Sequence, residues 1–185
     1  NRIEFQYYNT NVQLTSSNEG KEVTYGEEIE YEVEVSVEGQ KNIGEYGMPL
    51  VNVNLLDYLP SDVEPVSVTY DNWEEVLNEE DTVLDEEGNI EEYKPTGEYT
   101  KTQVTENISS DTTNDDGNRV ANVDLLLNIP YGETAHITIK TTAGLVYERT
   151  TVENSVTISN QQTGSKTANK VTHIILPLDY EEPTD

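Results

Sequence analysis

GEEIEYEVEVSV, residues 26–37, alternates apolar and acidic side chains with a period of two. The apolar members share one face, which consists of Ile29, Tyr31, Val33, Val35 and Val37. The other face carries Glu28, Glu30, Glu32 and Glu34. A helix would scatter the apolar residues around its circumference, whereas successive side chains of a strand point to opposite faces. The segment therefore predicts a strand of an antiparallel sheet with one buried face and one wet face.

A natural partner for this strand is ETAHITIKTT, residues 133–142. Its apolar side of Ala135, Ile137 and Ile139 alternates with a polar side that includes His136 and Lys140. Cross-strand pairs of Glu with Lys or Thr contribute a few tenths of a kcal/mol each, up to about 1 kcal/mol. We therefore expect the two segments to be adjacent strands.

The same alternation recurs in short segments separated by clusters of Gly, Pro, Asn and Asp. These segments are residues 12–16, 50–56, 66–70, 119–129, 152–158 and 170–176. Short strands at regular spacing with turn residues between them indicate a two-sheet antiparallel sandwich. We expect an all-β fold with one domain in residues 1–177 and an acidic, aperiodic linker in residues 178–185.

Composition excludes several classes of partner. The chain has 185 residues, no cysteine and a formal net charge of −27 at pH 7. Nucleic acid and anionic membrane surfaces would repel such a chain, whereas cations and basic proteins would not. No apolar run approaches the roughly 20 residues of a membrane-spanning helix, and no signal peptide opens the chain. We expect an excised module with no nucleic-acid partner and no direct membrane insertion.

Residues 71–118 differ in composition and are expected to form an acidic insertion between two strands of the sandwich. The segment is rich in Asp and Glu and contains only two lysines, Lys94 and Lys101. Residues 72–84 could hold a short helix that carries Trp73 and is capped by Asp71 or Asn72. Residues 85–89 read as a turn, and residues 100–108 as a strand.

Clustered carboxylate and amide oxygens in this insertion are the ligands that calcium prefers. The candidate ligands form two groups, Asp81, Asp85 and Glu87 in the first and Asp111, Asn114 and Asp116 in the second. Neither group matches the spacing of an EF-hand loop. A solvated acidic loop without metal is the favoured alternative, so no cofactor is expected apart from calcium at these groups.

Aromatic residues in the insertion suggest a ligand site. Trp73, Tyr93 and Tyr99 stand among carboxylates and amides, a combination that stacks on sugars or clamps a basic peptide. The favoured alternative is that Trp73 packs the insertion onto the sheet.

Three phrases in fixed order resemble a known family. They are GEEIEY at residues 26–31, VNVNLLDYLP at residues 51–60 and IPYGET at residues 129–134, followed by VENSVTI at residues 152–158. Together they are similar to the repeat domains of bacterial cell-surface proteins called DUF11-like, which are immunoglobulin-like sandwiches. The resemblance spans residues 12–176 apart from the acidic insertion.

The resemblance implies an extracellular stalk or spacer module, attached to the cell surface or cell wall, whose partners are neighbouring repeat domains of an adhesin, pilus-like or surface-layer protein. An adhesive module that binds a host protein or glycan through residues 71–118 is the alternative function.

Related surface domains carry an internal Lys–Asn isopeptide bond, which needs a desolvated amine, a carboxamide and a carboxyl group. Here Asn154 qualifies as acceptor, Asp57 or Glu28 as carboxyl group, and Lys21 as the nearest donor. The inward positions where the family places its lysine hold Val12, Leu14 and Ser16 instead. The favoured alternative is that Asn154 satisfies a buried backbone group.

Enzymatic activity is not expected. His136 is predicted on the outward face of its strand, and His173 lies near the end of the chain. Neither belongs to a visible Ser/His/Asp arrangement, and the sequence has no phosphate-binding glycine loop and no His-based metal motif.

Overall fold

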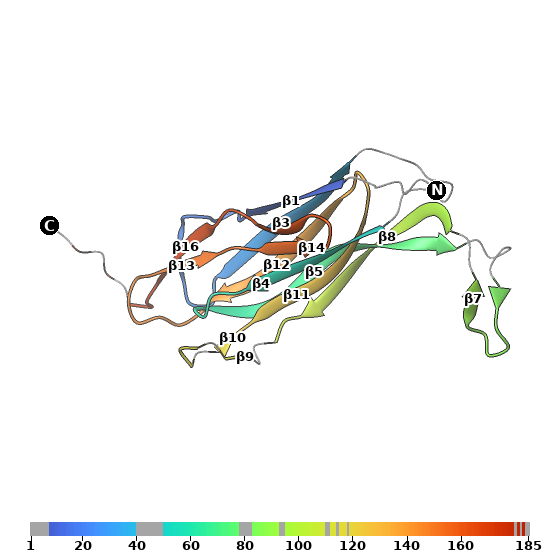
Figure 1. The fold of residues 1–185 in the computed structure, drawn as a ribbon. Helices are drawn as coiled ribbons and strands as arrows, with labels where there is room; N and C mark the ends of the chain where they lie inside the picture. Colours follow the sequence, from blue (N-terminus) through green and yellow to red (C-terminus); the bar gives the residue numbers. More distant parts are fainter. Residues whose placement is uncertain are drawn as a thin grey trace.

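The structure is a computed structural model that describes residues 8–39, 50–77, 83–92, 95–109, 112–113, 115–117, 119–179, 181 and 183. These residues form strands packed in two layers (Figure 1). No helix in the described part of the chain is suited to cross a membrane. The all-β, two-layer sandwich predicted from the alternating segments is confirmed.

The first layer is a five-stranded sheet with the order β1-β3-β12-β5-β8, in which every neighbouring pair is antiparallel. Its strands are β1 (Tyr8–Thr15), β3 (Glu28–Gly39), β12 (Thr134–Ala143), β5 (Val63–Leu77) and β8 (Pro95–Asn107).

The second layer contains a four-stranded sheet, β11-β4-β14-β15, and a three-stranded sheet, β13-β16-β2. The strands are β11 (Asn122–Pro130), β4 (Leu50–Tyr58), β14 (Thr157–Asn160), β15 (Gly164–Thr167), β13 (Thr150–Asn154), β16 (Val171–Leu176) and β2 (Glu22–Thr24). A short irregular stretch separates β13 from β14, and the hydroxyl of Ser155 donates there to the carbonyl of Ala168 at 2.9 Å. The pair β2–β16 is parallel.

Short two-stranded sheets lie within the predicted insertion and at its C-terminal boundary. One pairs β6 (Val83–Leu84) with β7 (Ile90–Glu92), and the other pairs β9 (Thr112–Thr113) with β10 (Arg119–Val120). The turn expected at residues 85–89 joins β6 to β7, and Gly88 adopts a positive φ of 87° in it.

Strand β3 lies where its sequence pattern predicts. The apolar side chains Ile29, Tyr31, Val33, Val35 and Val37 are each at most 1% exposed. Strand β12 is its neighbour, as expected, with Glu34 opposite His136 and Glu32 opposite Thr138. The Thr138 hydroxyl donates to the Glu32 carboxylate at 2.9 Å, so the glutamate row does find polar partners across the strand.

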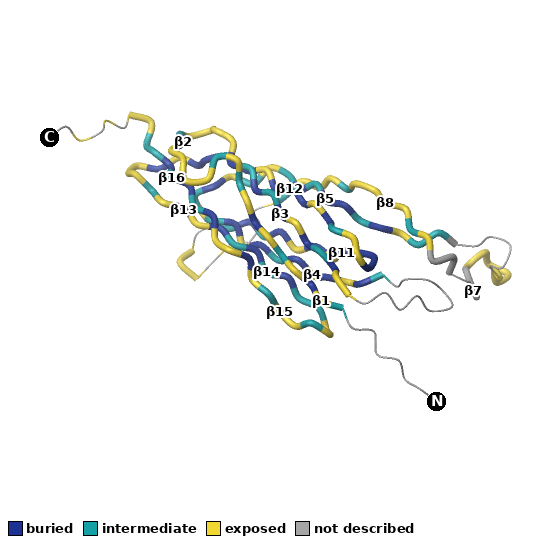
Figure 2. The backbone as a smooth tube through the Cα atoms, turned by 90° about the horizontal axis from the view of Figure 1, so that it is seen from above, coloured by how far each residue is buried: buried dark blue, intermediate teal, exposed yellow. Residues whose placement is uncertain are grey.

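The core lies between the layers and draws on both (Figure 2). The inward residues of β11 that the alternation predicts, Val123, Leu125, Leu127 and Ile129, are 0–5% exposed. Those of the β13–β14 segment, Val152, Asn154, Val156 and Ile158, are 0–3% exposed. Period-two alternation therefore identifies the buried face in both layers.

The helix expected in residues 72–84 is wrong over its described part. Residues 71–77 continue strand β5, and β8 pairs with them and with the preceding residues, from Ser67 opposite Asn107 to Leu77 opposite Pro95. The spacing of Trp73, Val76 and Leu77 imitates a helical face, but the Thr-rich segment of β8 supplies a strand partner that satisfies the backbone of β5.

Side chains of β5 hold this hairpin to the sandwich. Ladder pairing of β5 with β12 ends at Tyr70, and the Asp71 carboxylate then accepts a bond from the His136 backbone N–H at 3.0 Å. The Asn72 side-chain oxygen accepts from the Asn128 backbone N–H at 2.8 Å. The two side chains thus satisfy backbone groups of β12 and β11 that β5 itself leaves unpaired.

Candidate functional site

The described ends of the chain enter and leave the sandwich at opposite ends of its long axis (Figure 1). Strand β1 begins beside the turn between β14 and β15, where the Tyr8 hydroxyl donates to the Asn160 side chain at 2.7 Å. Strand β16 ends beside β2, where Leu176 lies opposite Thr24. A force applied at the two ends would therefore act along the strands.

A row of side chains from residues 160–173 binds β1 and the residue that follows it, and we call this row the edge seam. Its members are Asn160, Thr163, Lys166, Asn169 and His173, which contact Tyr8, Asn9, Thr10, Leu14 and Ser16. Residue numbers increase together on both sides of the seam, so β1 runs parallel to β15 and β16. The seam closes the edge where the two layers of the sandwich would otherwise lie open.

Asn169 forms the most strand-like contact of the seam. Its Nδ2 donates to the Leu14 carbonyl at 2.9 Å, and its Oδ1 accepts from the Leu14 N–H at 3.4 Å. One carboxamide therefore satisfies both backbone groups of a residue in β1, as a neighbouring strand would. Lys166 adds contacts from its Nζ to the Asn9 side chain and the Thr10 carbonyl.

A buried polar pair, Asp57 and Asn154, lies in the core. Asn154 Nδ2 donates to Asp57 Oδ2 at 2.8 Å. Asn154 is 3% exposed and Asp57 is 0% exposed. Burial raises the pKa of Asp57 to about 7, and the Asn154 hydrogen bond opposes this rise. Oδ1 of each residue has no hydrogen-bond partner among the described residues. A proton on Asp57 removes its buried charge and supplies a donor to a pair that otherwise holds more acceptors than donors.

Tyr31 and His173 are buried near this pair. Their rings meet edge to face with centroids 5.5 Å apart. Burial and the charge of Asp57 raise the pKa of Tyr31, and burial lowers the pKa of His173. The neutral forms of Tyr31 and His173 are therefore favoured, because a charged side chain in the core would not be solvated.

The contact of His173 with Ser16 is structural. Nε2 lies 2.9 Å from Ser16 Oγ and 3.0 Å from Asn18 Oδ1, and the Ser16 hydroxyl also lies 2.7 Å from the Glu30 carbonyl. Asn18 Oδ1 and the Glu30 carbonyl can only accept, so Nε2 carries the hydrogen that it shares with Asn18 Oδ1, and the Ser16 hydroxyl donates to the Glu30 carbonyl or to Asn18 Oδ1, which lies 2.9 Å from it. The imidazole is thus oriented as a donor toward the serine rather than as its base.

The structure brings together two of the residues considered for an isopeptide bond. Asp57 and Asn154 are in contact, so the amide of Asn154 meets a buried carboxyl group rather than the backbone group expected in the alternative. Lys21 and Glu28 are exposed. The bond needs a desolvated amine, and residues 12–16 place no lysine at the pair. The crosslink stays a prediction that a mass measurement decides.

The aromatic residues of the insertion are placed differently from one another. Trp73 is 5% exposed and belongs to the core, as its packing interpretation predicts. Tyr99 is partly buried and packs against that core, whereas Tyr93 lies outside the described residues. A ligand site built from these aromatics stays a prediction.

The proposed calcium ligands are only partly described. Asp85, Glu87 and Asp116 are exposed, and Asp81, Asp111 and Asn114 lie outside the described residues. Asp85 Oδ1 accepts from the Glu87 and Asn89 N–H groups at 3.0 and 2.8 Å, so it organises its own turn. Within the described ranges, no three His, Cys, Asp or Glu side chains gather as a metal site would require.

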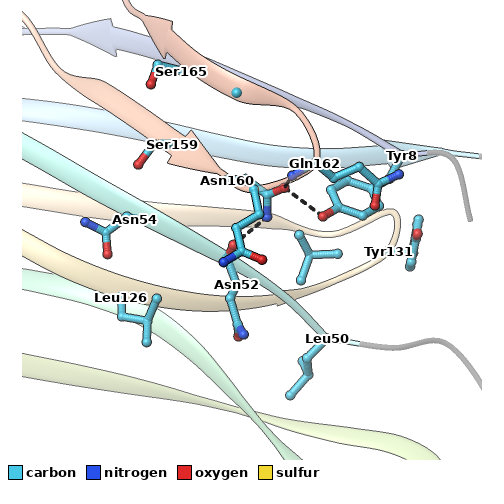
Figure 3. Close-up of a pocket in the computed structure, with 13 residues that line it drawn as sticks. Tyr8, Leu50, Asn52, Asn54, Leu126, Tyr131, Ser159, Asn160, Gln162 and Ser165 are labelled. Carbon is cyan, nitrogen blue, oxygen red and sulfur yellow. Dashed lines mark hydrogen bonds between the residues drawn. The ribbon is translucent and has the colours of Figure 1, made fainter.

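A groove of about 830 Å³ lies on the outward face of the second layer, at the end where β1 begins (Figure 3). Its wall is held by Asn160, whose Oδ1 accepts from the Tyr8 hydroxyl at 2.7 Å and from the Gln162 N–H at 2.8 Å. Asn160 Nδ2 donates to the Asn52 carbonyl at 2.6 Å. The ring of Tyr8 meets that of Tyr131 edge to face, with centroids 5.4 Å apart. The groove is therefore fixed by hydrogen bonds before any ligand arrives.

Sequence reasoning missed the edge seam and the groove. Asn160 ends β14 and Asn169 precedes β16, each about 150 residues from its partner in β1, and no local pattern connects such segments. His173 did carry a signal, because it alternates with Val171 and Ile175 and all three are fully buried.

No protein-family profile matches this chain, and no curated protein matches it in sequence. The resemblance to DUF11-like repeats therefore stays a prediction. Comparison of folds finds the N-terminal domain of the Streptococcus gordonii adhesin Sgo0707, with 14% identity, a TM-score of 0.43 and coverage of 89% of this chain and 32% of that chain. The full-length major pilin SpaD from Corynebacterium diphtheriae has 14% identity, a TM-score of 0.43 and coverage of 88% and 34%.

BcpA, the major pilin subunit of Bacillus cereus, has 9% identity, a TM-score of 0.43 and coverage of 91% and 40%. This chain thus spans 32–40% of the length of these three structures. An enzyme also matches: AvmM, which catalyses macrocyclization in alchivemycin A biosynthesis, has 13% identity, a TM-score of 0.35 and coverage of 96% and 92%. At these TM-scores the likeness carries no argument about function.

Proposed function

We propose that this chain is a non-catalytic, load-bearing spacer module of a bacterial cell-surface protein, joined to neighbouring modules through its ends. The observation that carries the proposal is the parallel course of β1 and β15–β16, linked by the edge seam. Tension pulls the start of β1 and the end of β16 in opposite directions along the strand axis. The bonds between these segments are then loaded together rather than one after another.

Backbone hydrogen bonds to neighbouring strands also hold β1 and β16, the two strands on which the force would act first. Strand β1 pairs with β3 from Tyr8 opposite Gly39 to Thr15 opposite Glu32. Strand β16 pairs with β13 on one side and with β2 on the other. A single hydrogen bond contributes only about 0.5–1.5 kcal/mol to stability. Resistance to force arises because these bonds share the load.

The end of the sandwich where β16 leaves carries exposed apolar side chains that suit a neighbouring module. Tyr25 lies directly after β2. The N–H of the next residue, Gly26, donates to the Ala143 carbonyl at 2.9 Å, so the loop that follows Ala143 and carries Leu145 begins at the same end of the sandwich. Tyr25 and Leu145 are 54% and 49% exposed, and Tyr147 and Leu178 are 89% and 62% exposed. Exposed apolar groups gathered at one end are typical of an interaction surface.

Support for an extracellular, cell-surface location comes from the phrases that resemble surface-protein repeats. The net charge of −27 adds solubility and disfavours anionic partners. Such a module needs no cofactor, and its partners are the adjacent modules of the same protein.

Single-molecule pulling on the chain through its two ends tests the proposal. Asn169→Ala removes the two hydrogen bonds to Leu14, and we expect it to lower the unfolding force. Asn11→Ala is the matched control, because Asn11 is an exposed amide on the outer side of the same β1 strand. Urea unfolding of both variants separates mechanical from thermodynamic effects. Equal unfolding forces for wild type and Asn169→Ala would contradict the proposal.

The alternative, an adhesive module that binds a host protein or glycan through residues 71–118 with or without calcium, stays a prediction. The described part of this segment lies largely as the extended hairpin of β5 and β8. No observation on the described residues favours it over the spacer.

A further inference from the structure

We propose that the groove at the β1 end of the second layer binds a neutral oligosaccharide. Its described lining residues are Asn, Gln, Ser, Tyr, Leu, Val and Gly, with no Asp, Glu, Lys, Arg or His among them. Charged residues make up 25% of the chain, so a groove free of them stands out from the rest of the surface. A charged ligand would find no counter-charge among these described lining residues.

The floor of the groove is a row of directly opposed residues on four strands. Leu126 of β11 lies opposite Asn54 of β4, Asn54 opposite Ser159 of β14, and Ser159 opposite Ser165 of β15. Strands lie about 4.8 Å apart, so this row spans about 14 Å. One apolar side chain, Leu126, is 58% exposed, and it is followed by an amide and two hydroxyls. This length and sequence of groups suit a chain of several sugar rings with apolar and hydroxyl faces.

The position of the groove on a sheet face argues against an extended peptide. Peptides that bind sheets pair with the free backbone groups of an edge strand. Here β4 is paired on both sides, with β11 and β14, so its backbone groups are already used along the floor. The hydrogen-bonding groups of the floor are the Ser159 and Ser165 hydroxyls and the side-chain amide of Asn54, whose Nδ2 also donates to Asp124 at 3.2 Å, and a ligand dense in hydroxyls matches them.

The opposite face of the molecule differs in charge. The outward side of β3 presents Glu28, Glu30, Glu32 and Glu34, which would attract cations to the first layer. The described lining of the groove has no such row of carboxylates, although Asp124 beside it accepts from Asn54 Nδ2 at 3.2 Å, and the overall charge of −27 repels anions. An uncharged described lining in a strongly acidic protein suits a neutral ligand.

The wall gives the groove a fixed shape. Asn160 links Tyr8 of β1, the turn at Gln162 and the backbone of Asn52 in β4 (Figure 3). A site that is ordered before binding avoids the entropy cost of ordering loops around a ligand. Asn160 is thus a positioning residue, whereas Asn54, Ser159, Ser165 and Leu126 form the contact surface.

The test is a glycan array that carries neutral and acidic oligosaccharides, followed by calorimetry with the neutral glycans that bind. The variant Asn54→Ala/Leu126→Ala removes two exposed floor residues, and Ser165→Trp fills the floor with a bulky ring. We expect each variant to weaken binding at least tenfold, whereas Asn11→Ala, an exposed amide on the other layer, leaves it unchanged. Far-UV circular dichroism confirms that the variants remain folded.

Neutral-glycan binding that persists from low to high salt and is lost in both floor variants would support the proposal. Binding of acidic glycans only, binding that neither floor variant weakens, or no binding at millimolar glycan would overturn it. None of these outcomes alters the unfolding force measured at the edge seam, so the spacer function is tested independently.

Discussion

Replacing Asp57 with Asn should change how the stability of this protein depends on pH. The pKa of Asp57 is about 7 in the folded protein, compared with an ordinary value of 3.8. Below pH 3.8 the carboxyl group is neutral in both states. As the pH rises toward 7, the unfolded chain ionises while the folded chain holds its proton, so folding stability is lost over this window.

One pKa unit corresponds to about 1.4 kcal/mol, so the whole window amounts to about 4 kcal/mol. Measurements should begin at pH 5, because the sequence has a pI of about 4.1 and solubility is lowest there. From pH 5 to pH 8 the expected change is about 3 kcal/mol. Asn154 Nδ2 can still donate to an Asn at position 57, so the Asp57→Asn variant keeps the observed hydrogen bond.

Urea unfolding at pH 5, 6, 7 and 8 measures this change as the difference in unfolding free energy between Asp57→Asn and wild type. The difference should grow in favour of the variant by about 3 kcal/mol across the series. Asp124→Asn is the control, since Asp124 is exposed and its carboxylate also accepts from an amide, Asn54 Nδ2 at 3.2 Å, which the oxygen of an Asn side chain can still accept. Parallel curves for wild type and Asp57→Asn would refute the assignment of a buried, proton-holding carboxyl group.

Further expectations concern the core, the crosslink and the insertion. Burial lowers the pKa of His173, so the stability that its neutral form contributes is present above about pH 6.5 and is lost as the pH falls. Urea unfolding should therefore show that the difference in unfolding free energy between wild type and His173→Gln becomes smaller from pH 7 to pH 5. Trp73→Ala should lower the unfolding free energy by about 3–5 kcal/mol, because the side chain is 5% exposed. A loss no larger than that of Tyr147→Ala, at a tyrosine that is 89% exposed, would contradict the packing role of Trp73. Intact-protein mass should equal the unmodified mass, whereas loss of one ammonia would show a bond between Lys21 and Asn154. Calcium should leave the melting temperature unchanged if the acidic groups of residues 71–118 are solvated, and a rise in melting temperature would establish a site.

The sandwich could be predicted wherever one face of a strand is buried and the other is wet. The alternation of residues 26–37 gave the orientation of β3, its partner β12 and the identity of the core residues between them. The alternation failed at residues 72–77. Strand β5 stops pairing with β12 after Tyr70, and the consecutive residues Tyr70 and Asp71 are both buried. Because the neighbouring strand changes there, burial no longer alternates with a period of two. The spacing of Trp73, Val76 and Leu77 then resembles that of a helix, which is why the sequence predicts one.

The candidate sites depended more strongly on contacts that sequence cannot reveal. Asn154 shares a predicted face with Val152, Val156 and Ile158, and a buried polar residue must find a partner in the core, whereas Asp57 is only one of two carboxyl candidates for it. That Asp57 and Asn154 pair with each other, beside Tyr31 and His173, depends on the packing of the two layers. The groove likewise arises from four strands whose order along the chain is not their order in the sheet.

The edge seam also governs when this protein finishes folding. Its contacts join residues that are 152 to 157 positions apart, from Tyr8 with Asn160 to Ser16 with His173. Contacts of such long range form late and slowly, because most of the chain must be arranged before they can be made. A growing chain that has not yet completed residues 160–173 therefore cannot fix its first strand, and until then β1 has neither the lysine nor the asparagines of the seam to hold it.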